Sequence, residues 1–375
     1  MKKIILLTIF VAIIIALSFY FQKTKEAPKE EQNLKAMIGQ MLVVGFRGAD
    51  LSSNPDIVKD IEDLNLGGVI LFDYDLPSKS YPRNITSPQQ LIKLTQDLQK
   101  TAETPLLIAI DAEGGKVNRL KEKYGFLNIP SAEEMGKEST EYTKAISKIL
   151  AIELKSLGIN TNFAPVVDVN VNPQNPVIGS LSRSFSDSPD KVTDHALSFI
   201  EGHQEEGIIT AIKHFPGHGS SLSDSHLGLA DVTQTYTQEE EIPFKELISS
   251  GKVDMVMTAH IINKNIDPDY PATLSEKFLK EILREELGFK GVIVSDDMQM
   301  GAIVQNFGFE ESIIRAINSG CDLLVFSNNG ETYDSEIAQK ASDIIYKAVS
   351  DGRIPKEAIT ASAERIRVLK ENYLD

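Results

Sequence analysis

The segment Val292-Ile293-Val294-Ser295-Asp296-Asp297 joins a short β-branched, apolar run to two acidic residues. Such a run is typical of a parallel strand that is covered on both faces. Seven more runs of this kind occur along the chain, at Met41–Phe46, Gly68–Phe72, Leu106–Ile110, Asn160–Ala164, Ile209–Lys213, Met255–Thr258 and Leu323–Phe326. With Val292–Ser295 they make eight candidate strands.

Longer amphipathic segments separate these strands and indicate helices. The clearest are Pro88–Thr101, Thr140–Leu157, Pro189–Glu205, Ser275–Leu287 and Asp334–Val349, with Lys356–Tyr373 as an extra terminal helix. Proline opens two of them, and glycine follows several, which suits the first turn and the C-terminal cap of a helix. Eight strand–helix alternations predict a single (β/α)8 TIM-type barrel of the α/β class rather than an open, doubly wound sheet.

Composition and charge narrow the classes of function. The chain has 375 residues and a formal charge of −16, from 54 acidic and 38 basic residues. This balance argues against a nucleic-acid partner, which would require clustered Lys and Arg. The single cysteine, Cys321, excludes an internal disulfide framework.

The N-terminus carries a membrane signal. Lys2 and Lys3 precede an uncharged, mostly apolar stretch at Ile4–Phe21, which as a helix would extend about 27 Å, close to the hydrocarbon thickness of a bilayer. Residues 1–22 are therefore expected to be a membrane anchor or a cleaved signal peptide, and the length of the span favours the anchor. A charged spacer is expected at 23–35, and 36–375 are expected to form the barrel domain with its extra C-terminal helix. The domain is expected outside the cytoplasm, tethered to the cell membrane, or secreted if the segment is cleaved.

Polar residues cluster where the predicted strands end, which is where a barrel builds its active site. Asp111 follows the third strand and precedes paired glycines, a pattern that can hold a ligand hydroxyl near the backbone, although Asp111 could instead cap a turn. Asp296 follows the seventh strand, and Asp297 could cap the next turn. Three further polar residues near strand ends are Asp168, Arg183 and His260, of which Asp168 and His260 could orient other side chains.

The fifth strand leads into Lys213-His214-Phe215-Pro216-Gly217-His218-Gly219. Two histidines four residues apart would suit a metal on a helix, but Pro216 and Gly217 make that helix improbable. We therefore expect no metal and no other cofactor. Lys213 and His214 better suit binding of sugar hydroxyls.

The loop beyond contains Asp224-Ser225-His226. In an extended loop, Asp224 can accept a hydrogen bond from one imidazole nitrogen of His226 and leave the other nitrogen for proton transfer. Taken alone, the same residues would fit a surface turn.

Together these segments resemble the bacterial β-N-acetylglucosaminidases of glycoside hydrolase family 3, from about residue 36 to 330. The resemblance rests on Ile110-Asp111-Ala112-Glu113-Gly114-Gly115, on the segment from Lys213 to His226, and on Ser295-Asp296-Asp297-Met298. It implies a retaining mechanism in which Asp296 is the nucleophile and His226, assisted by Asp224, is the general acid/base. It also implies that Asp111, Arg119, Arg183, Lys213 and His214 bind the substrate.

The implied substrate is a peptidoglycan fragment with a terminal β-linked N-acetylglucosamine. Lys116 stands where the family often has Arg, and the two residues do not make equivalent hydrogen bonds. The alternatives are a β-glucosidase or an N-acetylglucosaminide phosphorylase on the same barrel, or a non-catalytic wall-binding protein.

Overall fold

A closed barrel of eight parallel strands forms the centre of the molecule, in the order β1-β12-β11-β9-β7-β6-β3-β2. This computed structural model describes residues 30–224 and 228–374. The barrel strands are β1 (Leu42–Gly45), β2 (Gly68–Leu71), β3 (Leu107–Ile110), β6 (Thr161–Asn162), β7 (Ile209–Phe215), β9 (Met255–Thr258), β11 (Val292–Asp297) and β12 (Leu323–Phe326). The predicted α/β barrel is confirmed.

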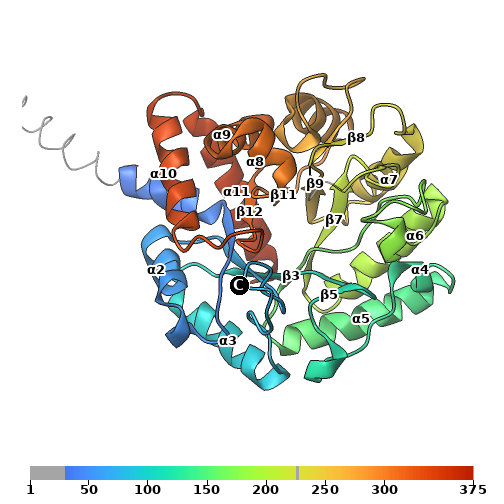
Figure 1. Ribbon diagram of the computed structural model, residues 1–375, viewed down its shortest axis with the longest axis horizontal. Helices are drawn as coiled ribbons and strands as arrows, with labels where there is room; N and C mark the ends of the chain where they lie inside the picture. The colour runs from blue at the N-terminus through green and yellow to red at the C-terminus, as the bar shows by residue number, and fades with distance from the viewer. Residues whose placement is uncertain (1–29, 225–227, 375) are drawn as a thin grey trace, which may run out of the picture.

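A ring of helices surrounds the barrel, and in Figure 1 it runs counterclockwise from α2 through α5 and α7 to α10. The helices are α2 (Pro55–Leu64), α3 (Pro88–Thr101), α4 (Ala132–Met135), α5 (Thr140–Ser156), α6 (Pro189–Gln204), α7 (Ile242–Ser249), α8 (Gly301–Phe307), α9 (Phe309–Ser319), α10 (Ile337–Ser350), α11 (Lys356–Tyr373) and η6 (Lys277–Glu286), which has π-type hydrogen bonds. Because helices cover their outer faces and side chains fill the interior, most barrel-strand residues are buried.

Short elements decorate the mouth of the barrel. They are the strands β4 (Ala112–Gly114), β5 (Val117–Asn118), β8 (Ala230–Asp231) and β10 (Ile261–Ile262), and the 3-10 turns η1 (Leu51–Ser53), η2 (Glu122–Tyr124), η3 (Gly179–Leu181), η4 (Gln238–Glu241) and η5 (Ala272–Leu274). The hairpin β4–β5 continues directly from β3, so it carries the residues that follow Asp111 over the barrel mouth.

Three strands end two residues away from their predicted C-terminal end, whereas other strand ends differ by at most one residue. β7 and β11 each continue two residues further, to Phe215 and Asp297, while β6 is reduced to two residues. The pairing of β11 with β12 shifts register between Val294 and Asp297, so the strand includes its polar tip. The acidic pair therefore lies within the strand, at its C-terminal end.

The N-terminal predictions fall largely outside the described residues, which include neither the 1–22 segment nor the start of the spacer. Residues 30–40 are helical and Leu34 is buried in the core, so the last residues of the 23–35 segment pack on the barrel. Within 30–224 and 228–374, no helix combines the length and the apolar character needed to span a bilayer.

Candidate active site

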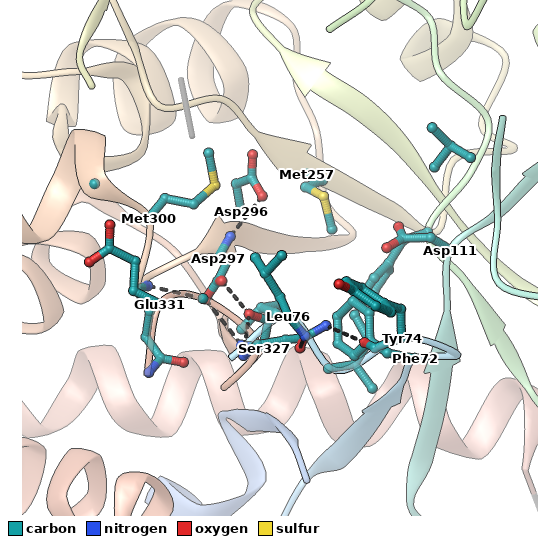
Figure 2. A pocket seen from close by; sticks show the side chains of 18 of the residues that line it. Phe72, Tyr74, Leu76, Asp111, Met257, Asp296, Asp297, Met300, Ser327 and Glu331 are labelled. Atoms are coloured by element: carbon teal, nitrogen blue, oxygen red, sulfur yellow. Dashed lines mark hydrogen bonds between the residues drawn. The ribbon is translucent and has the colours of Figure 1, made fainter. Parts of the chain in front are cut away.

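A cavity of about 920 Å³ opens at the C-terminal ends of the barrel strands. Its volume lies toward the upper end of the range of roughly 300–1,000 Å³ for small-molecule sites. Figure 2 shows Asp111 beside Phe72 and Tyr74, and Asp296 on another part of the wall near Met300. The predicted residues Asp111, Arg119, Arg183, Lys213, His214 and Asp296 all line this cavity.

Five of the lining residues form a charged cluster. The Lys213 ammonium lies 2.9 Å from an Asp111 carboxylate oxygen and 2.6 Å from one of Glu113. Arg183 donates to both Glu113 oxygens at 2.8 Å, and Arg119 donates to Asp111 at 3.2 Å. Two carboxylates and three cations thus lie side by side, and all five residues line the cavity.

Electrostatics keep this cluster ionised. Burial alone would raise the pKa of Asp111, but the positive charges of Lys213 and Arg119 outweigh burial and hold that pKa well below its usual range. Burial would likewise lower the pKa of Lys213, but Asp111 and Glu113 raise it above its ordinary value. The cluster therefore offers both charged donors and charged acceptors to a polyhydroxylated ligand.

His214 is oriented from behind by Asp168. An Asp168 carboxylate oxygen lies 2.7 Å from His214 Nδ1, and its other oxygen accepts from the backbone N–H groups of His214 and His218 at 3.2 and 2.7 Å. Asp168 is fully buried. The orienting role expected for Asp168 is thus present, and it directs His214 Nε2 toward Arg183, 3.4 Å away.

Asp296 lies at the tip of β11, on the opposite side of the closed strand order from β3 and Asp111. The backbone N–H of Asp297 donates to Asp296 Oδ1 at 2.7 Å. Asp297 in turn accepts hydrogen bonds from the backbone N–H and hydroxyl of Ser327 and from Gln299 N–H, as a turn-capping residue would. His260 Nε2 lies 2.9 Å from the carbonyl oxygen of Asp297, so His260 also supports this strand tip.

A buried arginine ties two segments of the mouth together. Arg83 donates to Asp75 at 2.6 Å and to the carbonyl oxygens of Ser327 and Asn328 at 3.4 and 3.0 Å. These contacts join the segment after β2 to the segment after β12. Ser327, which donates hydrogen bonds to Asp297, belongs to this second segment. The wall between these two strands is therefore fixed by side chains as well as by the barrel.

The predicted acid/base dyad is only partly within the described residues. Asp224 is partly exposed in the loop after β7, and His226 lies outside the described residues. The pairing of Asp224 with His226 therefore stays a prediction.

The two histidines weighed as metal ligands are both buried. Their rings meet edge to face with centroids 6.0 Å apart, and burial lowers the pKa of His218 to about 4. Within the described part of the chain, no three His, Cys, Asp or Glu side chains are grouped as metal ligands would be. Lys116 lies outside the cavity lining and donates to the Ser180 carbonyl oxygen at 2.8 Å.

Glu113 is the one member of the charged cluster to which the sequence assigned no role. It lies two positions after Asp111, and the alternation of a short extended hairpin sends both side chains to the same side. That spacing indicated that Glu113 lies on the same side as Asp111. It could not show that Glu113 pairs with Lys213, which is 100 positions away in the sequence.

Comparison with known proteins places this geometry in a family. The profile of the "Glycosyl hydrolase family 3 N terminal domain" matches residues 33–369. A "Beta-hexosaminidase" of Photobacterium profundum is 39% identical over 273 residues, which cover 72% of this chain and 77% of that protein. "Beta-hexosaminidase A" of Pseudoalteromonas piscicida is 33% identical over 376 residues, or 89% of this chain, which spans 60% of that relative's length.

Solved structures show the same likeness. A glycoside hydrolase family 3 β-N-acetylglucosaminidase from Paenibacillus sp. superposes with a TM-score of 0.82 at 36% identity, covering 90% of this chain and 62% of the other. A β-N-acetylhexosaminidase from Beutenbergia cavernae superposes with a TM-score of 0.78 at 27% identity, covering 90% and 98% of the two chains.

Proposed function

Because the chain belongs to glycosyl hydrolase family 3, we propose that it is a retaining exo-β-N-acetylglucosaminidase. The observation that carries the proposal is that one cavity is lined both by Asp296 and by the charged cluster around Lys213. A sugar ring held by its hydroxyls at that cluster would present its anomeric carbon toward Asp296. The relatives named for β-hexosaminidase activity support the choice of substrate.

In the proposed reaction, the Asp296 carboxylate attacks C1 while the bond from C1 to the leaving oxygen breaks. His226 gives its proton to that oxygen, and a covalent glycosyl-Asp296 ester remains. His226 then takes a proton from water, the hydroxide oxygen attacks C1, and the carboxylate is released. A histidine suits both steps because an imidazole can give up and take up a proton near neutral pH.

We further propose peptidoglycan fragments as the natural source of the terminal N-acetylglucosamine. A domain tethered outside the cytoplasm by the apolar stretch Ile4–Phe21 would meet such fragments. We propose the tether and the extracytoplasmic location as well. Fractionation of cells that express the full chain, followed by N-terminal sequencing, distinguishes an anchored from a cleaved form.

The test compares wild type, Asp296→Asn and His226→Ala on 4-nitrophenyl N-acetyl-β-D-glucosaminide. Asp296→Asn is expected to lose at least roughly 10³-fold in kcat, because an amide cannot attack C1. His226→Ala should retain more activity on this substrate than on a natural disaccharide, since nitrophenolate leaves with little protonation. Full activity in Asp296→Asn would disprove the assignment of the nucleophile.

Two control measurements separate the alternative functions. Release of N-acetylglucosamine at the same rate with and without inorganic phosphate identifies a hydrolase, whereas phosphate-dependent release of the sugar phosphate identifies a phosphorylase. Faster turnover of the corresponding β-glucoside would identify a β-glucosidase. A protein that is folded and inactive on every one of these substrates would fit the wall-binding alternative.

A further inference from the structure

Asp73 is a buried carboxylate in the cavity wall with unused hydrogen-bonding capacity. It follows β2, lines the cavity and is 3% exposed. Its Oδ2 atom is buried, and no group in the described part of the chain hydrogen-bonds to it. The cost of burying a polar atom in this way is recovered only when a partner arrives, and the cavity is where a ligand would supply that partner.

The backbone around Asp73 is held in place. The Asp73 carbonyl oxygen accepts from the backbone N–H of Arg83 at 2.8 Å, and the Arg83 side chain is fixed by its own contacts to Asp75 and the β12 side. Lys121 is near enough for the charge of Asp73 to oppose the lowering of the Lys121 pKa by burial. No hydrogen bond between Lys121 and Asp73 occurs, so the carboxylate retains its capacity as an acceptor.

Arg119 supplies the complementary group. Arg119 lines the same cavity, and its Nε atom is buried and has no hydrogen-bond partner in residues 30–224 and 228–374. The charges of Arg119 and Asp73 both act on Lys121, so the two side chains lie in the same part of the wall. A hydroxyl both donates and accepts, so one sugar hydroxyl could donate to Asp73 and accept from Arg119. The pair therefore fits a hydroxyl better than a carboxylate, a phosphate or an amine.

The order of the strands indicates which hydroxyl this is. Right-handed crossovers make successive strands follow one another counterclockwise when the barrel is seen from the C-terminal strand ends, as in Figure 1. In the proposed mechanism Asp296 attacks the α face of the sugar, and the leaving group departs through the mouth on the β face. Seen from the mouth, the ring carbons of a D-sugar then run clockwise.

With C1 at β11, this handedness places each ring carbon near a strand. C4 comes to β3, opposite β11, and C5 with its hydroxymethyl group comes to β2, the next strand in the clockwise direction. Leu71 of β2 pairs with Ile110 of β3, so the two strands end at the same level beneath the bound ring. Two carboxylates, Asp73 and Asp75, follow β2, and of these Asp73 lines the cavity.

From this geometry we propose that Asp73 is a specificity-determining residue that accepts a hydrogen bond from the C6 hydroxyl of the terminal N-acetylglucosamine. The inference rests on the proposed function. It adds a requirement that the terminal sugar carry a free C6 hydroxyl. A sugar that is acylated or otherwise substituted at that oxygen is a poor substrate, since it leaves the buried carboxylate without a donor.

The experiment compares a 4-nitrophenyl N-acetyl-β-D-glucosaminide with its 6-deoxy analogue, in wild type and in Asp73→Ala. Wild type is expected to prefer the parent substrate by at least roughly 100-fold in kcat/KM, because a site built for a hydroxyl rejects an analogue without it. Asp73→Ala should lose activity on the parent but little on the analogue, which reduces the preference below roughly 10-fold. Asp73→Asn, which keeps the side-chain shape, covers the case in which the alanine variant does not fold.

Glu153→Gln is the matched control. Glu153 also has a buried carboxylate oxygen without a partner among the described residues, but it lies on α5 and does not line the cavity. This variant is expected to keep both rates and the full preference for the parent substrate.

Several outcomes would overturn the inference. One is a wild type that hydrolyses both substrates equally well, and another is an equal loss on both substrates in the Asp73 variants. A change in the preference over the C4 epimer, N-acetylgalactosaminide, without a change in the 6-deoxy preference would move the contact to C4 and contradict the C6 assignment. A folded wild type that is inactive on every N-acetylglucosaminide would instead disprove the proposed function on which the inference rests.

Discussion

Glu113 and Asp111 hold the Lys213 ammonium between two carboxylates within the cavity wall. Lys213 and Glu113 are almost fully buried and Asp111 is largely buried, so removal of one charge leaves a buried charge with one partner fewer. The same three residues would carry the hydrogen bonds to sugar hydroxyls in the proposed reaction. At the scale of the residue, the same charges therefore stabilise the fold and, in the proposed reaction, bind the substrate.

Glu113→Gln tests this coupling because it keeps the side-chain shape and removes one charge. Arg183 would then lose its carboxylate partner, and Lys213 would keep only Asp111, which it shares with Arg119. We expect kcat/KM to fall roughly 100-fold, or about 2.7 kcal/mol. The midpoint of thermal unfolding should fall as well. Glu201→Gln, which removes a partly exposed partner of Lys144, is the control and should change stability by at most about 1 kcal/mol. An unchanged kcat/KM in Glu113→Gln would mean that its charge is not needed for binding.

Helices α5 and α6 meet strand β6 through one buried histidine. His203 Nδ1 lies 2.7 Å from the Ser147 hydroxyl, and its Nε2 lies 3.0 Å from the Asn162 side-chain nitrogen. The His203 ring stacks on Phe199 with centroids 4.5 Å apart. Both ring nitrogens are occupied by neutral partners, so at the scale of the element His203 acts as a neutral, polar link between two helices and the barrel.

Burial lowers the pKa of His203 to about 3, from an ordinary value of 6.5. Between these two pH values the unfolded chain binds a proton at this site that the folded chain does not, so stability falls as the pH falls through this window. Protonation of this one site lowers the free energy of unfolding by at most about 1.4 kcal/mol for each pH unit within the window. Urea unfolding of wild type and His203→Gln at several pH values from 4.5 to 7.5 should show a steeper acid loss in wild type. Parallel curves for the two proteins would contradict the assignment of this acid sensitivity to His203.

The two ends of the barrel carry different tasks in the whole molecule. The mouth carries the charged cluster and Asp296, whereas the N-terminal strand ends are closed by α11. There the buried Asp322, just before β12, accepts from Arg284 at 2.6 Å, Arg365 at 2.8 Å and the Ser362 hydroxyl at 2.9 Å. Lys370 of α11 donates to the Gly67 carbonyl oxygen, just before β2, and so fastens the helix to a second strand.

Asp322→Asn should therefore affect stability and not catalysis. It leaves two arginines without their charged partner, and we expect the free energy of unfolding to fall by roughly 3–5 kcal/mol. At a temperature where the variant is folded, kcat/KM should stay within about twofold of wild type, because the proposed active site lies at the other end of the barrel. The control is Glu364→Gln, which removes one partner of the exposed ion pair between Glu364 and Arg367 on α11. A large loss of kcat/KM in folded Asp322→Asn would show that the two ends are coupled.

The sequence by itself determined the strands, the helices and their order. Apolar runs of strand length and amphipathic segments of helix length are local patterns, and α3 and α11 begin and end where the pattern predicted. Because parallel strands in a closed barrel all end at one face, the residues that follow them could be predicted to share a site. Asp111, Lys213, His214 and Asp296 do share one cavity.

Only the tertiary structure decided which side chains meet. The partner of Glu113 lies 100 positions away, and the unused oxygen of Asp73 is visible only when every neighbour is in place. The polar tip of β11 belongs to the strand because β12 pairs with it across a register shift, which the β11 segment does not encode. The periodicity of apolar residues depends only on the local segment, so it predicts which face of that segment is buried. Ion pairs, the burial of single atoms and the exact ends of strands depend on which distant segments pack against it in the barrel.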